Sequence, residues 1–93
     1  MSSRIDDTFA RLHQSGSKAF VAYICAGDPD LDTTLEIVRT LESSGVDIIE
    51  LGLPFSDPLA DGIVNQMAAG RAIASGTTTA GTLELIRKIR GFS

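Results

Sequence analysis

Two short apolar segments, separated by a stretch with helical periodicity, most constrain the fold of this 93-residue chain. In residues 19–26 the hydroxyl of Tyr23 is the single polar side-chain group, and residues 46–51 are β-branched and mostly apolar. Continuous apolar runs of this length are typical of strands buried on both faces of a parallel sheet. A strand, a helix and a strand within about 30 residues form a β-α-β unit with a right-handed crossover. The pattern therefore predicts an α/β fold.

Four helices are predicted around these strands. Between the strands, Thr33 and Glu36 have the spacing of a capping box, so a helix should begin within one to three residues of Thr33. The other three are predicted over residues 3–14, over residues 63–75 and from Thr79 onward. In chain order, the expected apolar stripes are Ile5, Phe9 and Leu12; Leu31 or Leu35, Val38 and Leu41; Met67, Ala68 and Ala72; and Leu83, Ile86 and Ile89 or Arg90.

The length allows one domain at most. The alternation of strands and helices calls for a further strand directly after Ser93, where the sequence stops. We therefore expect residues 1–93 to form a single incomplete domain, one part of a larger fold.

Composition excludes several classes of function. Eight Lys and Arg residues against twelve Asp and Glu residues give a net charge of −4 without a basic stripe, so nucleic acid is not an expected partner. Apolar runs fall short of the roughly 20 residues that span a membrane, and the N-terminus does not resemble a signal peptide. The single cysteine, Cys25, lies among apolar residues and indicates a reducing compartment. We expect a cytoplasmic protein.

Glu50 is the residue that most suggests chemistry, because it interrupts the second apolar run near its carboxyl end. Strand alternation places Glu50 on the same face as Ile48 and Gly52. In a closed parallel barrel this face could open at the mouth, where desolvation raises the pKa of a carboxyl group and suits it for proton donation. Alternatively, Glu50 forms an ion pair with an Arg or Lys of a neighbouring element. Both interpretations stay open at this point.

The loop after Glu50 carries two further carboxylates, Asp57 and Asp61, at the same strand end. They could serve a cleft together with Glu50, or they could form Asx turns with their own backbone ahead of Pro58 and Gly62. Asp28, after the first strand, has the same two interpretations. Gly-rich phosphate motifs and metal-ligand clusters are absent from the sequence, and His13 is expected on the surface of the first helix.

Residues 50–62 closely resemble the signature of the tryptophan synthase alpha chain family, and Gly27, Asp28 and Pro29 agree with it. The resemblance extends in looser form along essentially the whole chain. It implies a (β/α)8 TIM barrel, a fold of typically about 250 residues, of which this chain would be the N-terminal part, about two strands with their helices. It also implies retro-aldol cleavage of indole-3-glycerol phosphate to indole and glyceraldehyde 3-phosphate, without a cofactor or a metal.

The resemblance also implies roles for single residues. Glu50 would deliver a proton to indole C3, and Asp61 would stabilise positive charge at the indole nitrogen. Tyr23, which base rates alone would place in the core, would lie against the indole ring. The family's beta chain would dock on the loop that contains Phe55, Ser56, Asp57 and Pro58. Ile63 and Val64 depart from the family, in which a proline commonly follows the glycine of the signature.

Two hypotheses remain from the sequence. In the first, the chain is part of a lyase and is catalytic only when the rest of the barrel is present. In the second, it is a non-catalytic fragment that acts only in folding or in binding the beta subunit. The phosphate site of such barrels is built by late loops that are missing from residues 1–93, so we expect this chain alone to be inactive.

Overall fold

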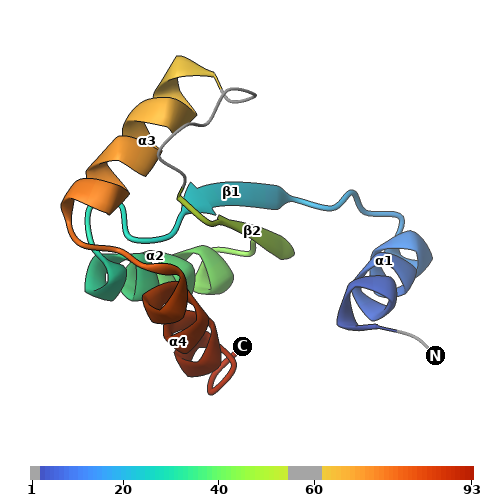
Figure 1. The fold of residues 1–93 in the computed structure, drawn as a ribbon. Helices are drawn as coiled ribbons and strands as arrows, with labels where there is room; N and C mark the ends of the chain where they lie inside the picture. Colours follow the sequence, from blue (N-terminus) through green and yellow to red (C-terminus); the bar gives the residue numbers. More distant parts are fainter. Residues whose placement is uncertain (1–2, 55–61) are drawn as a thin grey trace.

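The computed structural model describes residues 3–54 and 62–93, which form two strands and four helices (Figure 1). Strands β1 and β2 pair in parallel, with α2 as the crossover between them, so the predicted β-α-β unit is confirmed. The elements are α1 (Arg4–Ser15), β1 (Val21–Cys25), α2 (Leu31–Ser43), β2 (Ile48–Gly52), α3 (Ile63–Ala74) and α4 (Thr79–Ile89).

Helices α2 and α4 lie side by side on one face of the sheet (Figure 1). On the other face, Val21 is 43% exposed and Tyr23 is 45% exposed. The prediction that the first strand is buried on both faces is therefore wrong. The reason is that, within the described part of the chain, the two-stranded sheet has a helix layer on one side, while its opposite face meets α3 only at the carboxyl end of β1.

Helix α2 begins at Leu31, within three residues of Thr33 as predicted, but its capping residue differs from the predicted one. The side chain of Asp30 accepts a hydrogen bond from the backbone N–H of Thr33 at 2.7 Å and is the N-cap. Thr33 is thus inside the helix, and the predicted capping box with Glu36 is wrong, because an earlier aspartate already satisfies the free N–H groups of the first turn. Thr34 and Val38 are the fully buried residues of α2. Gly45 follows the C-cap residue Ser44 with a φ of 99°.

Helix α3 packs on the carboxyl end of β1 and does not join the layer of α2 and α4 (Figure 1). Its buried face consists of small residues that cluster with Cys25: Ala68, Ala69 and Ala72. The expected member Met67 is exposed, because the face that meets β1 is centred on the alanines.

Helix α4 packs through a different stripe from the predicted one. Thr82 and Leu85 are buried, whereas Leu83 and Ile86 are exposed. The Cβ position of Gly81 lies 3.1 Å from the Leu31 side chain, so the close approach to α2 sets which side of α4 is covered.

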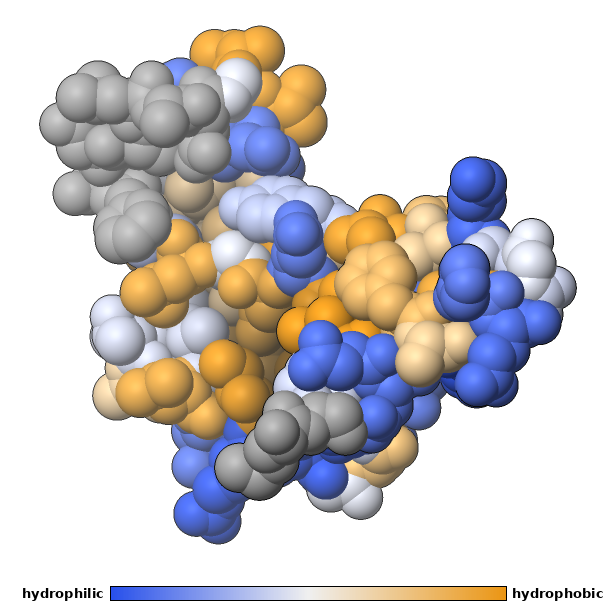
Figure 2. Space-filling model, turned by 90° about the vertical axis from the view of Figure 1, so that its right-hand side faces the viewer, coloured by the Kyte–Doolittle hydropathy of each residue, from blue (hydrophilic) through white to orange (hydrophobic). Residues whose placement is uncertain are grey.

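Helix α1 lies at the amino-terminal end of the strands, away from α3 (Figure 1). Leu12 is buried, but Ile5 and Phe9 are exposed, so the predicted stripe is covered at one position only. Seen from the side of α1, hydrophobic residues gather between hydrophilic ones on the surface (Figure 2). No helix of the described residues is long and apolar enough to cross a membrane.

Candidate active site at the carboxyl ends of the strands

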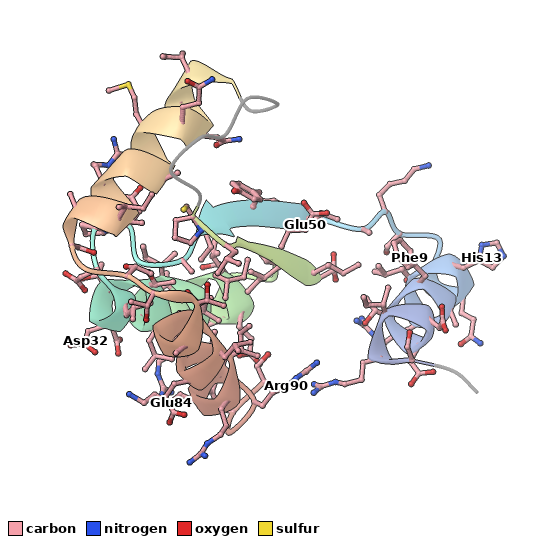
Figure 3. The ribbon with its side chains drawn as sticks, viewed as in Figure 1. Phe9, His13, Asp32, Glu50, Glu84 and Arg90 are labelled. Carbon is pink, nitrogen blue, oxygen red and sulfur yellow. The ribbon has the colours of Figure 1, made fainter. Side chains whose placement is uncertain are left out.

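Tyr23 and Glu50 are paired residues in the ladder between β1 and β2. Paired residues of neighbouring strands carry their side chains on the same face, here the face opposite α2 and α4. Glu50 is exposed and projects from this face (Figure 3). Among residues 3–54 and 62–93, no Lys or Arg forms an ion pair with Glu50. The described residues therefore offer no support for the ion-pair interpretation.

Gly52 makes room for the ring of Tyr23 at the end of β2. A side-chain carbon at Gly52 would overlap the Tyr23 hydroxyl oxygen. The aromatic side chain thus reaches across from β1 to the carboxyl end of the neighbouring strand. It forms an aromatic wall on the face that carries Glu50.

The loop after β1 is held by two hydroxyl groups, those of Thr34 and Ser75. The backbone N–H of Gly27 donates to Thr34 Oγ1 at 3.0 Å, and that hydroxyl donates to the carbonyl of Asp30 at 2.7 Å. Ser75 Oγ donates to the carbonyl of Gly27 at 3.1 Å. Gly27 has a φ of 87°, and the Thr77 side chain occupies the space where a Cβ would lie. Only glycine fits this position without moving Thr77 or straining the backbone.

Asp28 and Arg71 form a two-point ion pair between this loop and α3. Arg71 Nε lies 2.8 Å from Asp28 Oδ1, and Arg71 Nη2 lies 2.9 Å from Asp28 Oδ2. The hydrogen bonds from Arg71 lower the pKa of Asp28, and the same contacts raise the pKa of Arg71. Bidentate pairs of this kind fix orientation as well as distance. The two residues are 43 positions apart, and no local sequence pattern predicts their contact.

Several predicted site residues lie outside the described residues: Phe55, Ser56, Asp57, Pro58 and Asp61. The structure describes the two ends of their connection. Leu53 and Pro54 follow β2, and Gly62 is the N-cap of α3 with an extended backbone. The connection therefore begins after β2, the strand of Glu50, and ends at the start of α3. Arg71 of α3 binds Asp28 in the loop after β1.

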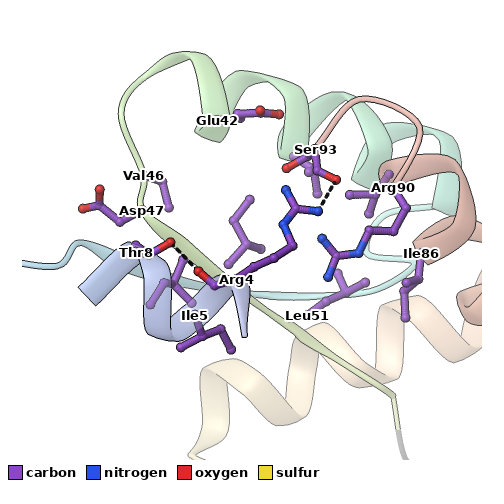
Figure 4. Close-up of a pocket in the computed structure, with 14 residues that line it drawn as sticks. Arg4, Ile5, Thr8, Glu42, Val46, Asp47, Leu51, Ile86, Arg90 and Ser93 are labelled. Carbon is purple, nitrogen blue, oxygen red and sulfur yellow. Dashed lines mark hydrogen bonds between the residues drawn. The ribbon is translucent and has the colours of Figure 1, made fainter. Parts of the chain in front are cut away.

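Other parts of the described chain lack features of a second reactive centre. His13 is exposed on α1, away from the strand ends, as expected (Figure 3). No group of three or more potential metal ligands occurs in the described ranges. A cavity of about 480 Å³ lies between α1, α2, β2 and α4, and Arg4 donates a hydrogen bond to the Ser93 carbonyl beside it (Figure 4). Neither Tyr23 nor Glu50 lines this cavity.

Residues 9–92 match the family model of the tryptophan synthase alpha chain. The chain belongs to this family. The alpha chain of Opitutus terrae is 55% identical over 91 residues, which cover 98% of this chain and 34% of that relative. The alpha chain of Citrifermentans bemidjiense is 54% identical over 88 residues, which cover 95% of this chain and 33% of that relative. The chain thus spans about a third of the length of these curated relatives.

Solved structures agree with this membership. Tryptophan synthase subunit alpha of Legionella pneumophila superposes with a TM-score of 0.95 at 39% identity, covering 100% of this chain and 36% of that one. A ligand-free form of tryptophan synthase from Mycobacterium tuberculosis superposes with a TM-score of 0.86 at 32% identity, covering 91% and 34%. The predicted fold class, part of a (β/α)8 TIM barrel with about two parallel strands and their helices, is confirmed.

Proposed function

We propose that residues 1–93 form an incomplete domain of a tryptophan synthase alpha subunit and that this subunit, when complete, cleaves indole-3-glycerol phosphate. The products are indole and glyceraldehyde 3-phosphate. The observation that carries the proposal is the position of Glu50 in a chain of this family. Glu50 lies near the carboxyl end of β2, is exposed, and pairs with Tyr23 of β1. It has no ion-pair partner among the described residues.

Glu50 is proposed as the acid of the reaction. Proton transfer from its carboxylic acid to indole C3 forms a new C–H bond and leaves positive charge on the ring nitrogen. Cleavage of the bond from C3 to the side chain then returns its electron pair to the indole ring. The hydroxyl group on the departing carbon becomes the aldehyde and gives up its proton, which restores the protonated carboxyl group. Atoms and charge balance without a cofactor or a metal.

Asp61 is proposed to stabilise the positive charge at the indole nitrogen. A carboxylate fixed near that nitrogen lowers the energy of the transition state through electrostatic attraction. The support for this role is the resemblance of residues 50–62 to the family signature. Asp61 also directly precedes Gly62, the N-cap of a helix attached to the end of β1.

Tyr23 is proposed to form one wall of the indole site. Its ring reaches over Gly52 and lies on the face from which Glu50 projects. An aromatic wall beside the proton donor suits the flat apolar indole ring of the substrate, because ring stacking aligns the indole plane while leaving C3 accessible.

The proposed macromolecular partner is the tryptophan synthase beta chain, in an assembly of two alpha and two beta chains. Support comes from the resemblance of the loop that contains Phe55, Ser56, Asp57 and Pro58, and from family membership. Transfer of indole between the subunits would then avoid its loss to solvent. We propose the cytoplasm as the compartment, in keeping with the single buried Cys25.

Indole release tests the proposed function. The chain should be joined to the remaining two thirds of the Opitutus terrae alpha chain, a protein that we call the completed subunit. The completed subunit should release indole from indole-3-glycerol phosphate, whereas residues 1–93 alone should not, because the phosphate site of such barrels is formed by late loops. A folded completed subunit that releases no indole would contradict the proposal.

A further inference from the structure

We propose that Gly52 is a positioning residue for the lyase site, because the lack of a side chain at this position lets the Tyr23 ring lie across the carboxyl end of β2. The inference rests on the proposed function for its catalytic consequence, since Tyr23 is proposed as one wall of the indole site. Its structural part, the control of the Tyr23 ring by position 52, does not depend on any activity.

The strand pairing brings Tyr23 and Gly52 together although they are not direct partners. Tyr23 pairs with Glu50, and Gly52 pairs with Cys25, so Tyr23 and Gly52 are diagonal neighbours on one face of the sheet. The three heavy atoms nearest to a Cβ at Gly52 all belong to Tyr23: the hydroxyl oxygen, Cζ at 2.6 Å and Cε2 at 2.8 Å. The ring therefore fills the space that a side chain at position 52 would take.

Glycine is needed at position 52 for space and not for its backbone conformation. Gly52 lies in a strand and does not have a positive φ, unlike Gly27 in the loop after β1. An alanine could adopt the extended backbone of Gly52 without strain. The obstacle to a larger residue that the structure shows is the Tyr23 ring.

The backbone at Gly52 is held in place, so the ring would have to move to admit a side chain. The carbonyl of Gly52 accepts a hydrogen bond of 2.8 Å from the backbone N–H of Ala26, which is fully buried. A shift of position 52 would leave this buried donor without its acceptor, which is costly. Tyr23 is 45% exposed and can rotate about its side-chain bonds. Carbon atoms pack at about 3.5 Å or more, so Cζ and Cε2 would move by roughly 1 Å.

A displaced ring would change the proposed indole site beside the acid. Glu50 is the strand partner of Tyr23 and projects from the same face (Figure 3). Since the indole plane is proposed to stack on the Tyr23 ring, a shift of the ring would move C3 relative to the carboxyl group of Glu50. A misplacement of roughly 1 Å is enough to reduce a catalytic rate by as much as 10²-fold. Gly52→Ala should therefore impair the reaction through Tyr23.

The kinetic test is a double-mutant cycle in the completed subunit: Gly52→Ala, Tyr23→Leu and the two combined. Leucine lacks the three Tyr23 atoms that meet a Cβ at position 52, so it makes room for the alanine. Gly52→Ala should lower kcat/KM at least about tenfold in the parent and less than about twofold in the Tyr23→Leu background. Equal losses in both backgrounds, or a single variant that keeps more than about half of the parent's kcat/KM, would overturn the proposal. If Gly52→Ala does not fold, the double variant should fold, and its failure as well would overturn the proposal.

Gly70→Ala is the matched control. Gly70 is exposed in α3, and among the described residues no atom of another element lies within 4 Å of its Cβ position. The same change from glycine to alanine thus adds a methyl group without a clash. The control should keep kcat/KM within about twofold of the parent's value. A loss equal to that of Gly52→Ala would attribute the effect to the added methyl group in general and overturn the proposal.

Crystal structures give a readout that needs no substrate. In the Gly52→Ala completed subunit, the Tyr23 ring should be displaced by at least about 1 Å from its position in the parent, while the backbone of β2 stays in place. A ring that keeps the parent's position would overturn the positioning role whatever the activity. If the parent completed subunit released no indole but the ring moved as expected, the proposed function would fail and the control of the Tyr23 ring by position 52 would stand.

Discussion

Tyr23 and Glu50 are direct partners in the parallel pairing of β1 and β2, and their side chains share the face of the sheet that no helix layer covers in the described residues. This relationship depends on the register of the strands. A slip of one residue would turn Glu50 toward the layer of α2 and α4, where Ile49 and Leu51 now lie. The pairing thus places the proposed acid and the proposed aromatic wall together.

Glu50→Gln in the completed subunit should abolish indole release. The amide has nearly the shape of the carboxylic acid but cannot supply the proton, and general acid catalysis typically contributes 10²–10⁴-fold. The rate of indole release under saturating substrate measures the loss. A variant that keeps more than about a tenth of the parent's rate would show that another group donates the proton.

Asp61→Asn should lower turnover with little loss of stability, because the proposed role depends on the negative charge rather than on the fold. The melting temperature and kcat of the completed subunit should be measured together. If the melting temperature fell by more than about 8 °C, the result would favour the alternative in which Asp61 forms a structural Asx turn.

Asp57→Ala should weaken binding of the beta chain to the completed subunit. An aromatic residue beside a carboxylate on a loop is a plausible contact for a partner, and loss of one such charge at an interface typically raises Kd. Isothermal calorimetry with purified beta chain gives the affinity. An unchanged Kd would remove Asp57 from the proposed interface.

Thr34→Val should destabilise the completed subunit by about 1–3 kcal/mol, because the buried N–H of Gly27 loses its acceptor. Valine has nearly the same volume, so the change reports the hydrogen bond rather than a cavity. Urea denaturation measures the free energy of unfolding. Thr33→Val on the same helix is the control and should change stability by less than about 0.5 kcal/mol. Equal effects at both positions would contradict the role of the Thr34 hydroxyl.

The ion pair of Asp28 and Arg71 should make stability depend on acid pH. Arg71 lowers the pKa of Asp28 in the folded state, so the stabilisation is complete above the ordinary aspartate pKa of about 4 and is lost as the pH falls through the lower folded value. Urea denaturation of the completed subunit and of Asp28→Asn should show a constant difference above about pH 5 that shrinks below about pH 4. A difference that stays constant down to about pH 2 would contradict this assignment.

The order of strands and helices could be predicted from the sequence because it follows from local patterns. The apolar runs around Tyr23 and Glu50 and the apolar stripes of the helices are short-range signals, and the structure confirms the strands and helices that they predict. The N-cap of α2 was predicted wrongly because Asp30 and Thr33 are both suitable capping residues. Sequence spacing alone does not show which of them faces the free N–H groups.

Tertiary relationships could not be predicted in the same way. Alternation identified the face of Glu50, but its pairing with Tyr23 depends on the strand register. Asp28 and Arg71 are 43 residues apart, and their contact exists only because α3 packs on the end of β1. The buried stripe of α4 differs from the predicted one because the close approach of Gly81 to α2 decides which side is covered.

Helix α3 stands outside the alternation of strand and crossover helix, since it is inserted between β2 and α4 and does not join the layer of α2 and α4. Its alanines and Arg71 contact the end of β1 and the loop after it, whereas Ile63, Val64 and Met67 are exposed. Hydrogen bonds of Arg71 and of Ser75, directly after α3, link this end of the helix to Asp28 and Gly27 in the loop after β1. Substitutions at the exposed positions of α3 would change the surface near the carboxyl ends of the strands while the alanine cluster with Cys25 stays in place.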